Sequence, residues 1–185
     1  MRQRLSHSIT AVLALAAWAA PMIGHAEDDI LKKAINAPGV TNWEIHGVDD
    51  RNIVDDPTVA GGKALRMVIP GQGQNPWDIV AQNTVKGRIN KGDQLYGAVW
   101  IHAVKTENGA PGRVTIRLQE AAAPYGGLAQ TSFEVKGGWE LYTVTTIAGA
   151  SYPAGATNIA VHLATSKQTI DLGPVFVIDT GPPAH

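Results

Sequence analysis

Four side chains suited to holding a ligand recur on the polar side of two segments that alternate apolar and polar residues. Arg117 and Gln119 alternate with a run of Val, Ile and Leu, the period of two that gives a strand one apolar and one polar face. Trp100 and His102 alternate in the same way with the apolar residues of the preceding segment. Aromatic rings stack on the apolar faces of pyranose rings, and amide, imidazole and guanidinium groups bond to hydroxyls. The four residues predict a sugar-binding surface, provided that both strands share one face.

Other residues extend this surface. Asp78 and Gln82 are spaced to share one face of a strand, and His162 points away from the core side of its own strand. Trp77 and Tyr125 adjoin prolines in loops, where an exposed ring can form the edge of a groove. Each residue taken alone also fits a solvated or structural role. The full predicted ligand-binding set is Trp77, Asp78, Gln82, Trp100, His102, Arg117, Gln119, Tyr125 and His162.

Catalytic and metal motifs are weak. The histidines show neither an i, i+4 pair nor an H-E-x-x-H motif, so zinc chemistry is not predicted. The segment around Ser151, Gly-Ala-Ser-Tyr-Pro, lacks the second glycine of the G-x-S-x-G nucleophile elbow, so no serine hydrolase is predicted. Most acids lie in turns, where local hydrogen bonds explain them better than a catalytic carboxylate pair does. We predict no catalytic residue. The alternative is an enzyme that cleaves a polysaccharide, in which His102 or His162 acts as the base and Arg117 neutralises the charge of a uronate.

Residues 1–26 have the pattern of a secretory signal peptide. Arg2 and Arg4 precede an apolar run that is too short for a membrane span, and small residues lead to a cleavage site after Ala26. We expect a secreted or periplasmic protein whose single domain covers 27–185. After cleavage no membrane association is predicted.

Charge and cysteine content narrow the classes of partner. The formal net charge is −1 for the full chain, and it becomes −3 when Arg2 and Arg4 are removed with the signal peptide. This balance predicts no nucleic-acid binding. The chain contains no cysteine, so disulfides and thiolate metal sites are excluded.

Turn residues divide the domain into short, β-rich segments. A helix is predicted only in 27–39, where acids come first and Pro38-Gly39 end the segment. The predicted strands are 43–48, 63–69, 78–83, 95–103, 113–120, 130–135, 140–147, 158–163 and 169–178. This pattern predicts an all-β fold, a two-sheet antiparallel jelly-roll β-sandwich with one short N-terminal helix.

Six segments in order resemble the CenC-like carbohydrate-binding modules of families four and nine. They run from GGKALRMVIPG through NPWDIVAQ, GDQLYGAVWIHA, VTIRLQE and FEVKGGWELYTVT to YPAGATNIAVHLATSKQTIDLGPVFV, and the resemblance as a whole covers about 49–178. The W-x-x-Y-T of residues 139–143 and the Q-T-I-D-L-G of residues 168–173 carry much of the likeness.

The resemblance implies a galactose-binding-like jelly roll that binds a plant or bacterial polysaccharide or oligosaccharide without cleaving it. It also implies a separate glycanase as a partner. A protein-interaction domain at the cell surface or in the periplasm is the remaining alternative. Such modules often hold a structural calcium, which stays open here because Leu172 follows Asp171 where the family has two adjacent acids. No other cofactor is predicted.

Overall fold

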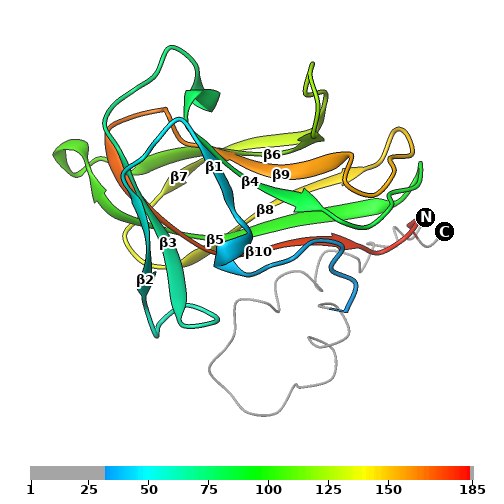
Figure 1. Ribbon diagram of the computed structural model, residues 1–185, viewed down its shortest axis with the longest axis horizontal. Coiled ribbons are helices and arrows are strands. Elements are labelled where there is room, and N and C mark those ends of the chain that lie inside the picture. The colour runs from blue at the N-terminus through cyan, green and yellow to red at the C-terminus, as the bar shows by residue number, and fades with distance from the viewer. Residues whose placement is uncertain (1–31, 184–185) are drawn as a thin grey trace, which may run out of the picture.

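The structure, a computed structural model, describes residues 32–183, and these residues form two five-stranded antiparallel sheets packed face to face (Figure 1). Sheet I contains, in spatial order, β1 (Glu44–His46), β4 (Val80–Val85), β9 (Thr157–His162), β6 (Gly112–Glu120) and β7 (Gly127–Val135). Sheet II contains β2 (Arg51–Asp55), β3 (Lys63–Ile69), β10 (Gln168–Asp179), β5 (Gln94–Thr106) and β8 (Glu140–Ile147). The short 3₁₀ turns are η3 (Val40–Asn42), η4 (Pro76–Asp78) and η5 (Glu107–Gly109). The predicted jelly-roll sandwich is confirmed.

The core lies between the two sheets and follows the alternation of the sequence. In β6, Ile116 and Leu118 are buried against the inward residues of sheet II, and Arg117 lies on the outer face. Gln119 breaks the simple pattern, because this outer-face residue is only 5% exposed. The outer face of sheet I is therefore partly shielded from solvent, because a polar side chain on it is buried.

The N-terminal helix is not formed in the part of its segment that the structure describes. Residues 27–31 lie outside the described range, Lys32 and Lys33 lie in a turn, and no helix follows before the short turn η3. Ala34 bridges Ile178 of sheet II, and Asn36 bridges Val85 of sheet I. The Asn36 side chain also accepts a hydrogen bond from the Val177 amide at 2.7 Å. These tertiary bonds tie the segment to both sheets and override its helical propensity.

Two further differences concern strand ends and missed strands. β4 begins at Val80 rather than at residue 78, because η4 occupies the residues before it. The strand β2 was not predicted, since its residues are mostly exposed and its two apolar residues, Ile53 and Val54, are adjacent and do not alternate with polar ones. The predicted signal peptide lies outside the described residues. Within residues 32–183, no helix has the length and apolar character needed to cross a bilayer.

Candidate functional site

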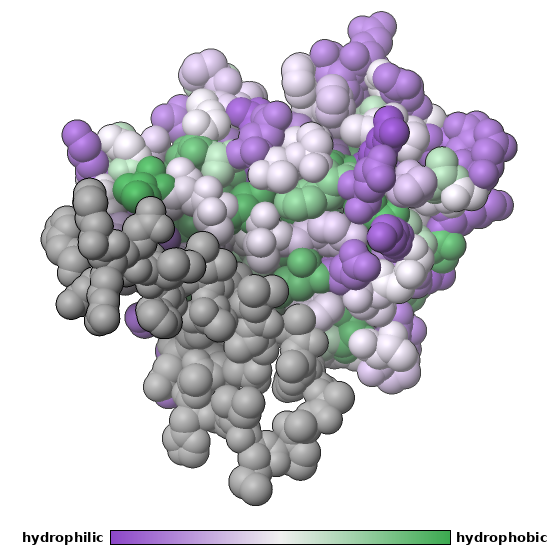
Figure 2. Space-filling model, turned by 180° about the vertical axis from the view of Figure 1, so that it is seen from behind, coloured by the Kyte–Doolittle hydropathy of each residue, from purple (hydrophilic) through white to green (hydrophobic). Residues whose placement is uncertain are grey.

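The outer face of sheet I is hollowed into a groove of about 540 Å³. In Figure 1 the connection from β3 to β4, which contains η4, and the loop from β6 to β7 both rise above this sheet. Seen from behind, the surface dips between these two projections (Figure 2). The lining consists of His46, Trp77, Val80, Gln82, Arg117, Gln119, Pro124, Tyr125 and His162.

The floor of the groove is set by cross-strand pairing of β4, β9 and β6. Ala160 in the central strand pairs with Gln82 on one side and with Arg117 on the other. Directly opposed residues in antiparallel strands point to the same face, so all three share the outer face. Gln82 and Arg117, which flank this alanine, both line the groove, whereas Ala160 itself is fully buried.

Trp77 forms one wall and owes its position to a capped turn. The carboxylate of Asp78 accepts a hydrogen bond from the Asn75 amide at 2.9 Å, which closes a capping box around η4. Gly47 (φ +83°) passes directly beneath this turn, and a Cβ there would lie 1.8 Å from the Asp78 carbonyl oxygen. The Trp77 ring is 56% exposed and meets the ring of His162 edge-on, with centroids 6.1 Å apart.

Asp78 therefore departs from its expected place. It does not share a strand face with Gln82, because it ends η4 and its carboxylate bonds back to Asn75. It does not line the groove. The observed role of Asp78 is to position Trp77, because it fixes the turn that carries the ring.

Tyr125 forms the opposite wall at the tip of the β6–β7 loop. Its backbone has φ +56°, a left-handed conformation that non-glycine residues seldom adopt and that costs of order 1 kcal/mol. The ring is 49% exposed. Arg117 donates from Nη2 to the Tyr125 carbonyl oxygen at 3.2 Å, so a floor residue holds the loop. Such strain at an exposed aromatic residue is typical of a functional site.

The floor contains buried polar atoms with no partner inside the protein. Asn158, which pairs with Gln119 across the strands, donates to Oε1 of Gln82 at 2.7 Å. Oε1 of Gln119, Oδ1 of Asn158 and Nε of Arg117 are buried and have no hydrogen-bond partner. Buried polar atoms almost always find a partner, so three such atoms close together set this floor apart from the rest of the described residues.

His162 is uncharged at neutral pH. Burial lowers its pKa from 6.5 to about 4, and the positive charge of Arg117 contributes to the shift. A neutral imidazole both donates and accepts hydrogen bonds, which suits sugar hydroxyls. It is also a weak base, which suits proton abstraction poorly.

This pKa shift predicts a loss of stability in mild acid. Between pH 6.5 and about 4 the unfolded chain binds a proton at His162 that the folded chain does not bind, so stability falls as the pH falls through this window. We expect the change from pH 7.5 to pH 5 to cost the wild-type protein about 2 kcal/mol more than it costs His162→Asn. Urea unfolding of both proteins at the two pH values measures this difference. Equal losses would contradict the prediction.

Trp100 and His102 do not share a groove with Arg117 and Gln119. Both belong to β5 in sheet II, where Trp100 pairs with Leu141 and His102 pairs with Asp171. They lie on the outer face of the opposite sheet, so the prediction of one shared surface is wrong for these two residues. The physical reason is that β5 and β6, although consecutive, belong to different sheets.

The outer face of sheet II instead holds an ionic network. Asp171 is fully buried, and both its oxygens accept hydrogen bonds from Arg66 at 2.8 Å. The ring of His102 packs against the Trp139 ring at 5.5 Å. Trp139 in turn donates from Nε1 to Asp56 at 3.0 Å. Hydrogen bonds from Thr58 and Trp139 lower the pKa of Asp56.

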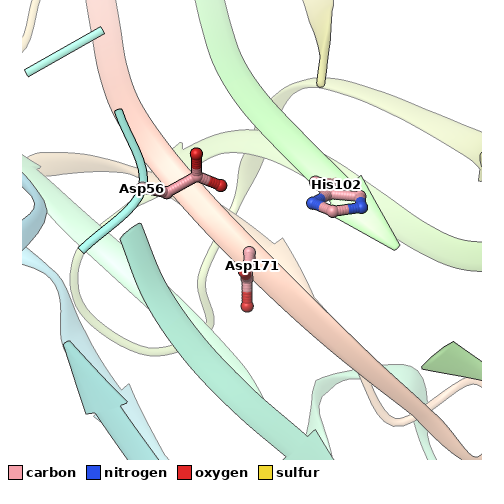
Figure 3. Close-up of side chains that lie close together, drawn as sticks. All are labelled: Asp56, His102 and Asp171. Carbon is pink, nitrogen blue, oxygen red and sulfur yellow. The ribbon is translucent and has the colours of Figure 1, made fainter. Parts of the chain in front are cut away.

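Three members of this network could be read as a metal site, and Figure 3 shows their side chains close together. Ligand atoms of Asp56, His102 and Asp171 lie within 4.8 Å of each other. Calcium takes six to eight oxygen ligands, whereas this group offers an imidazole and a carboxylate already paired with Arg66. The residues therefore do not fit the structural calcium that the family resemblance leaves open.

Two other acids, Asp55 before the Gly61-Gly62 pair and Asp179 at the end of β10, do not join this group. Asp55 pairs with Lys63, and Asp179 accepts a hydrogen bond from the Gly181 amide at 2.8 Å. Burial raises the pKa of Asp179, which disfavours its charged form.

Sequence reasoning missed some groove residues. His46, Val80 and Pro124 line the groove, and Asn158 lies in its floor beside Gln119. Asn158 could have been found, because it alternates with Ala160 and His162 along one strand. His46 gave no comparable signal, since its strand has only three residues.

Comparison with solved structures identifies the fold. A CBM4 carbohydrate-binding module is 21% identical with a TM-score of 0.59, and the match covers 76% of this chain and 96% of that one. The second N-terminal cellulose-binding domain of Cellulomonas fimi β-1,4-glucanase C is 15% identical with a TM-score of 0.56, covering 84% and 95%. The Stig cyclase Fisc from Fischerella sp. TAU is 14% identical with a TM-score of 0.56, covering 80% and 90%.

No protein-family model matches the sequence, and no curated protein matches it. Identities of this size show the fold alone. Because one of these similar structures is a cyclase, the fold by itself does not separate binding from catalysis. The chain has the jelly-roll fold of the family-four carbohydrate-binding modules.

Proposed function

We propose that this protein is an exported, non-catalytic carbohydrate-binding module that holds a glycan in the groove of sheet I. The observation that carries the proposal is the groove itself, with two exposed aromatic walls, Trp77 and Tyr125, over a floor of buried polar side chains. The rings would contact the apolar faces of the sugars, and the floor would bond to their hydroxyls.

The chemistry of the lining favours binding over cleavage. None of the described residues that line the groove is an aspartate or a glutamate, so the groove lacks the carboxylate pair of a glycosidase. A lyase would need a base, and His162, with its lowered pKa, is a weak one.

The structural neighbours support the same class of function. One is a carbohydrate-binding module, and another is a cellulose-binding domain of a glucanase. We extend to this chain only the shared element, which is a polysaccharide ligand, and we propose a separate glycanase as its partner. Export rests on the signal-peptide pattern of residues 1–26.

The test is affinity electrophoresis and calorimetry of the folded protein over xylan, β-glucan, cellulose oligosaccharides, alginate and polygalacturonate. We expect measurable binding to at least one of them and no release of products. Absence of binding to the whole panel by a protein that melts cooperatively would contradict the proposal. Product release that His162→Asn abolishes would favour the enzymatic alternative.

A further inference from the structure

Arg117 places an unpaired positive charge in the groove. Within residues 32–183, no carboxylate oxygen lies within 4 Å of its guanidinium nitrogens, and the three ion pairs found there involve other residues. Its one hydrogen bond goes to the neutral carbonyl of Tyr125, and its Nε has no partner. A partly buried cation is normally paired, so this arrangement is unusual for a purely structural arginine.

The rest of the lining does not balance this charge. Of the described residues that line the groove, Arg117 is the one with a permanent charge, and no acid accompanies it. The groove face therefore presents a local positive centre on a chain whose formal net charge is −1. A neutral sugar would leave that centre uncompensated when it displaces water from the floor.

The geometry of a guanidinium suits one sugar substituent in particular. Its planar fork matches the two oxygens of a carboxylate, and charge-assisted pairs of this kind are about twice as strong as neutral hydrogen bonds. Arg117 stands beside Ala160 at the centre of the floor, between the walls formed by Trp77 and Tyr125. A ring held between these walls would place a substituent within reach of Arg117.

We infer that the groove selects an acidic glycan, one whose uronate carboxylate pairs with Arg117. This inference rests on the proposed glycan binding and names the class of sugar that the site takes. The aromatic walls supply contact that neutral and acidic sugars share, and Arg117 supplies the discrimination between them.

The test compares oligosaccharides that differ in charge alone. Oligogalacturonate, oligoalginate and glucuronic-acid-bearing xylo-oligosaccharides are each titrated beside their carboxyl-reduced forms, in which –COOH has become –CH₂OH. We expect at least one acid to bind roughly tenfold more tightly than its reduced form at low salt, and the difference to shrink at high salt. Arg117→Gln should remove the difference, so that each acid binds no more tightly than its reduced form.

Two variants separate charge from structure. Lys105→Gln removes one exposed positive charge from a strand of sheet II and should leave the preference intact. Arg117→Lys keeps the charge without the fork and should keep part of the preference. The inference would be overturned if Arg117→Lys lost the preference and Arg117→Gln no longer bound even the reduced oligosaccharide. Arg117 would then be a residue that only holds the Tyr125 loop.

The remaining outcomes are also decisive. Equal affinity for acidic and reduced forms, or a preference that survives Arg117→Gln, would overturn acid selection and leave glycan binding standing. Failure of every acidic, reduced and neutral oligosaccharide to bind would overturn the proposed function, and acid selection with it.

Discussion

Replacement of Trp77 by alanine is expected to weaken glycan binding by roughly 30-fold, about 2 kcal/mol, which is the size of effect found for a central aromatic contact. The side chain is 56% exposed in the free protein, so its removal should change the free energy of unfolding by less than about 0.5 kcal/mol. The loss of affinity would therefore report a lost ligand contact rather than a damaged fold. Calorimetric titration and a urea melt of the variant measure both quantities.

A tryptophan on the other sheet is the matched control. Trp100 lies on the outer face of sheet II, away from the groove, and Trp100→Ala should leave affinity unchanged once the fold is shown to be intact. Comparable losses in both variants, or a larger loss in Trp100→Ala, would place the ligand somewhere other than on sheet I.

Replacement of Arg66 by methionine is expected to destabilise the protein by about 3 kcal/mol or more. Asp171 is fully buried and its two oxygens bond to Arg66, so the variant leaves a buried carboxylate without its partner. The side chain of Arg66 is 36% exposed, which places the expected cost at the lower end of the range for broken buried pairs. Urea unfolding at pH 7 measures the cost.

The double variant Arg66→Met with Asp171→Leu tests the cause. Removing both charges leaves nothing unpaired, so most of the lost stability should return. Glycan affinity should stay the same in both proteins, because the network lies on sheet II and the groove on sheet I. A double variant as unstable as the single one would show that the cost comes from packing rather than from charge.

The alternation of residues was enough to predict the two-sheet sandwich and much of the groove floor. Gln82, Arg117, Gln119 and His162 were expected on the polar sides of their strands, and the structure places all four in the groove lining. The two rim aromatics were expected from their loops beside proline, and both line the groove. Periodicity fixes the face on which a side chain lies, and this information was sufficient for those positions.

Periodicity does not say which sheet a strand joins. The outward faces of β5 and β6 look alike in sequence, but the connection through η5 carries the chain from sheet II to sheet I. Trp100 and His102 thus lie on the outer face opposite the groove, and His102 pairs across strands with Asp171 instead. Strand pairing between distant segments decides this outcome, and no local pattern records it.

Local hydrogen bonds decided the fate of other residues. Asp78 reads as a strand residue, yet its carboxylate is the right length to cap the turn that begins at Asn75. The segment from Lys32 has helical composition, yet Asn36 bonds to Asn83 and Val177 of the sandwich. In both cases hydrogen bonds to specific partners outweigh the intrinsic propensity of the residues and set the local structure.

The central claim is that the glycan lies against sheet I, between Trp77 and Tyr125. The most direct measurement is an NMR titration of the ¹⁵N-labelled protein with an oligosaccharide that it binds, following the indole N–H signals. Each signal is assigned with a Trp→Phe variant. The account predicts that the Trp77 signal shifts in proportion to saturation while those of Trp43, Trp100 and Trp139 stay in place. A shift centred on Trp100 and Trp139, with Trp77 unmoved, would contradict it.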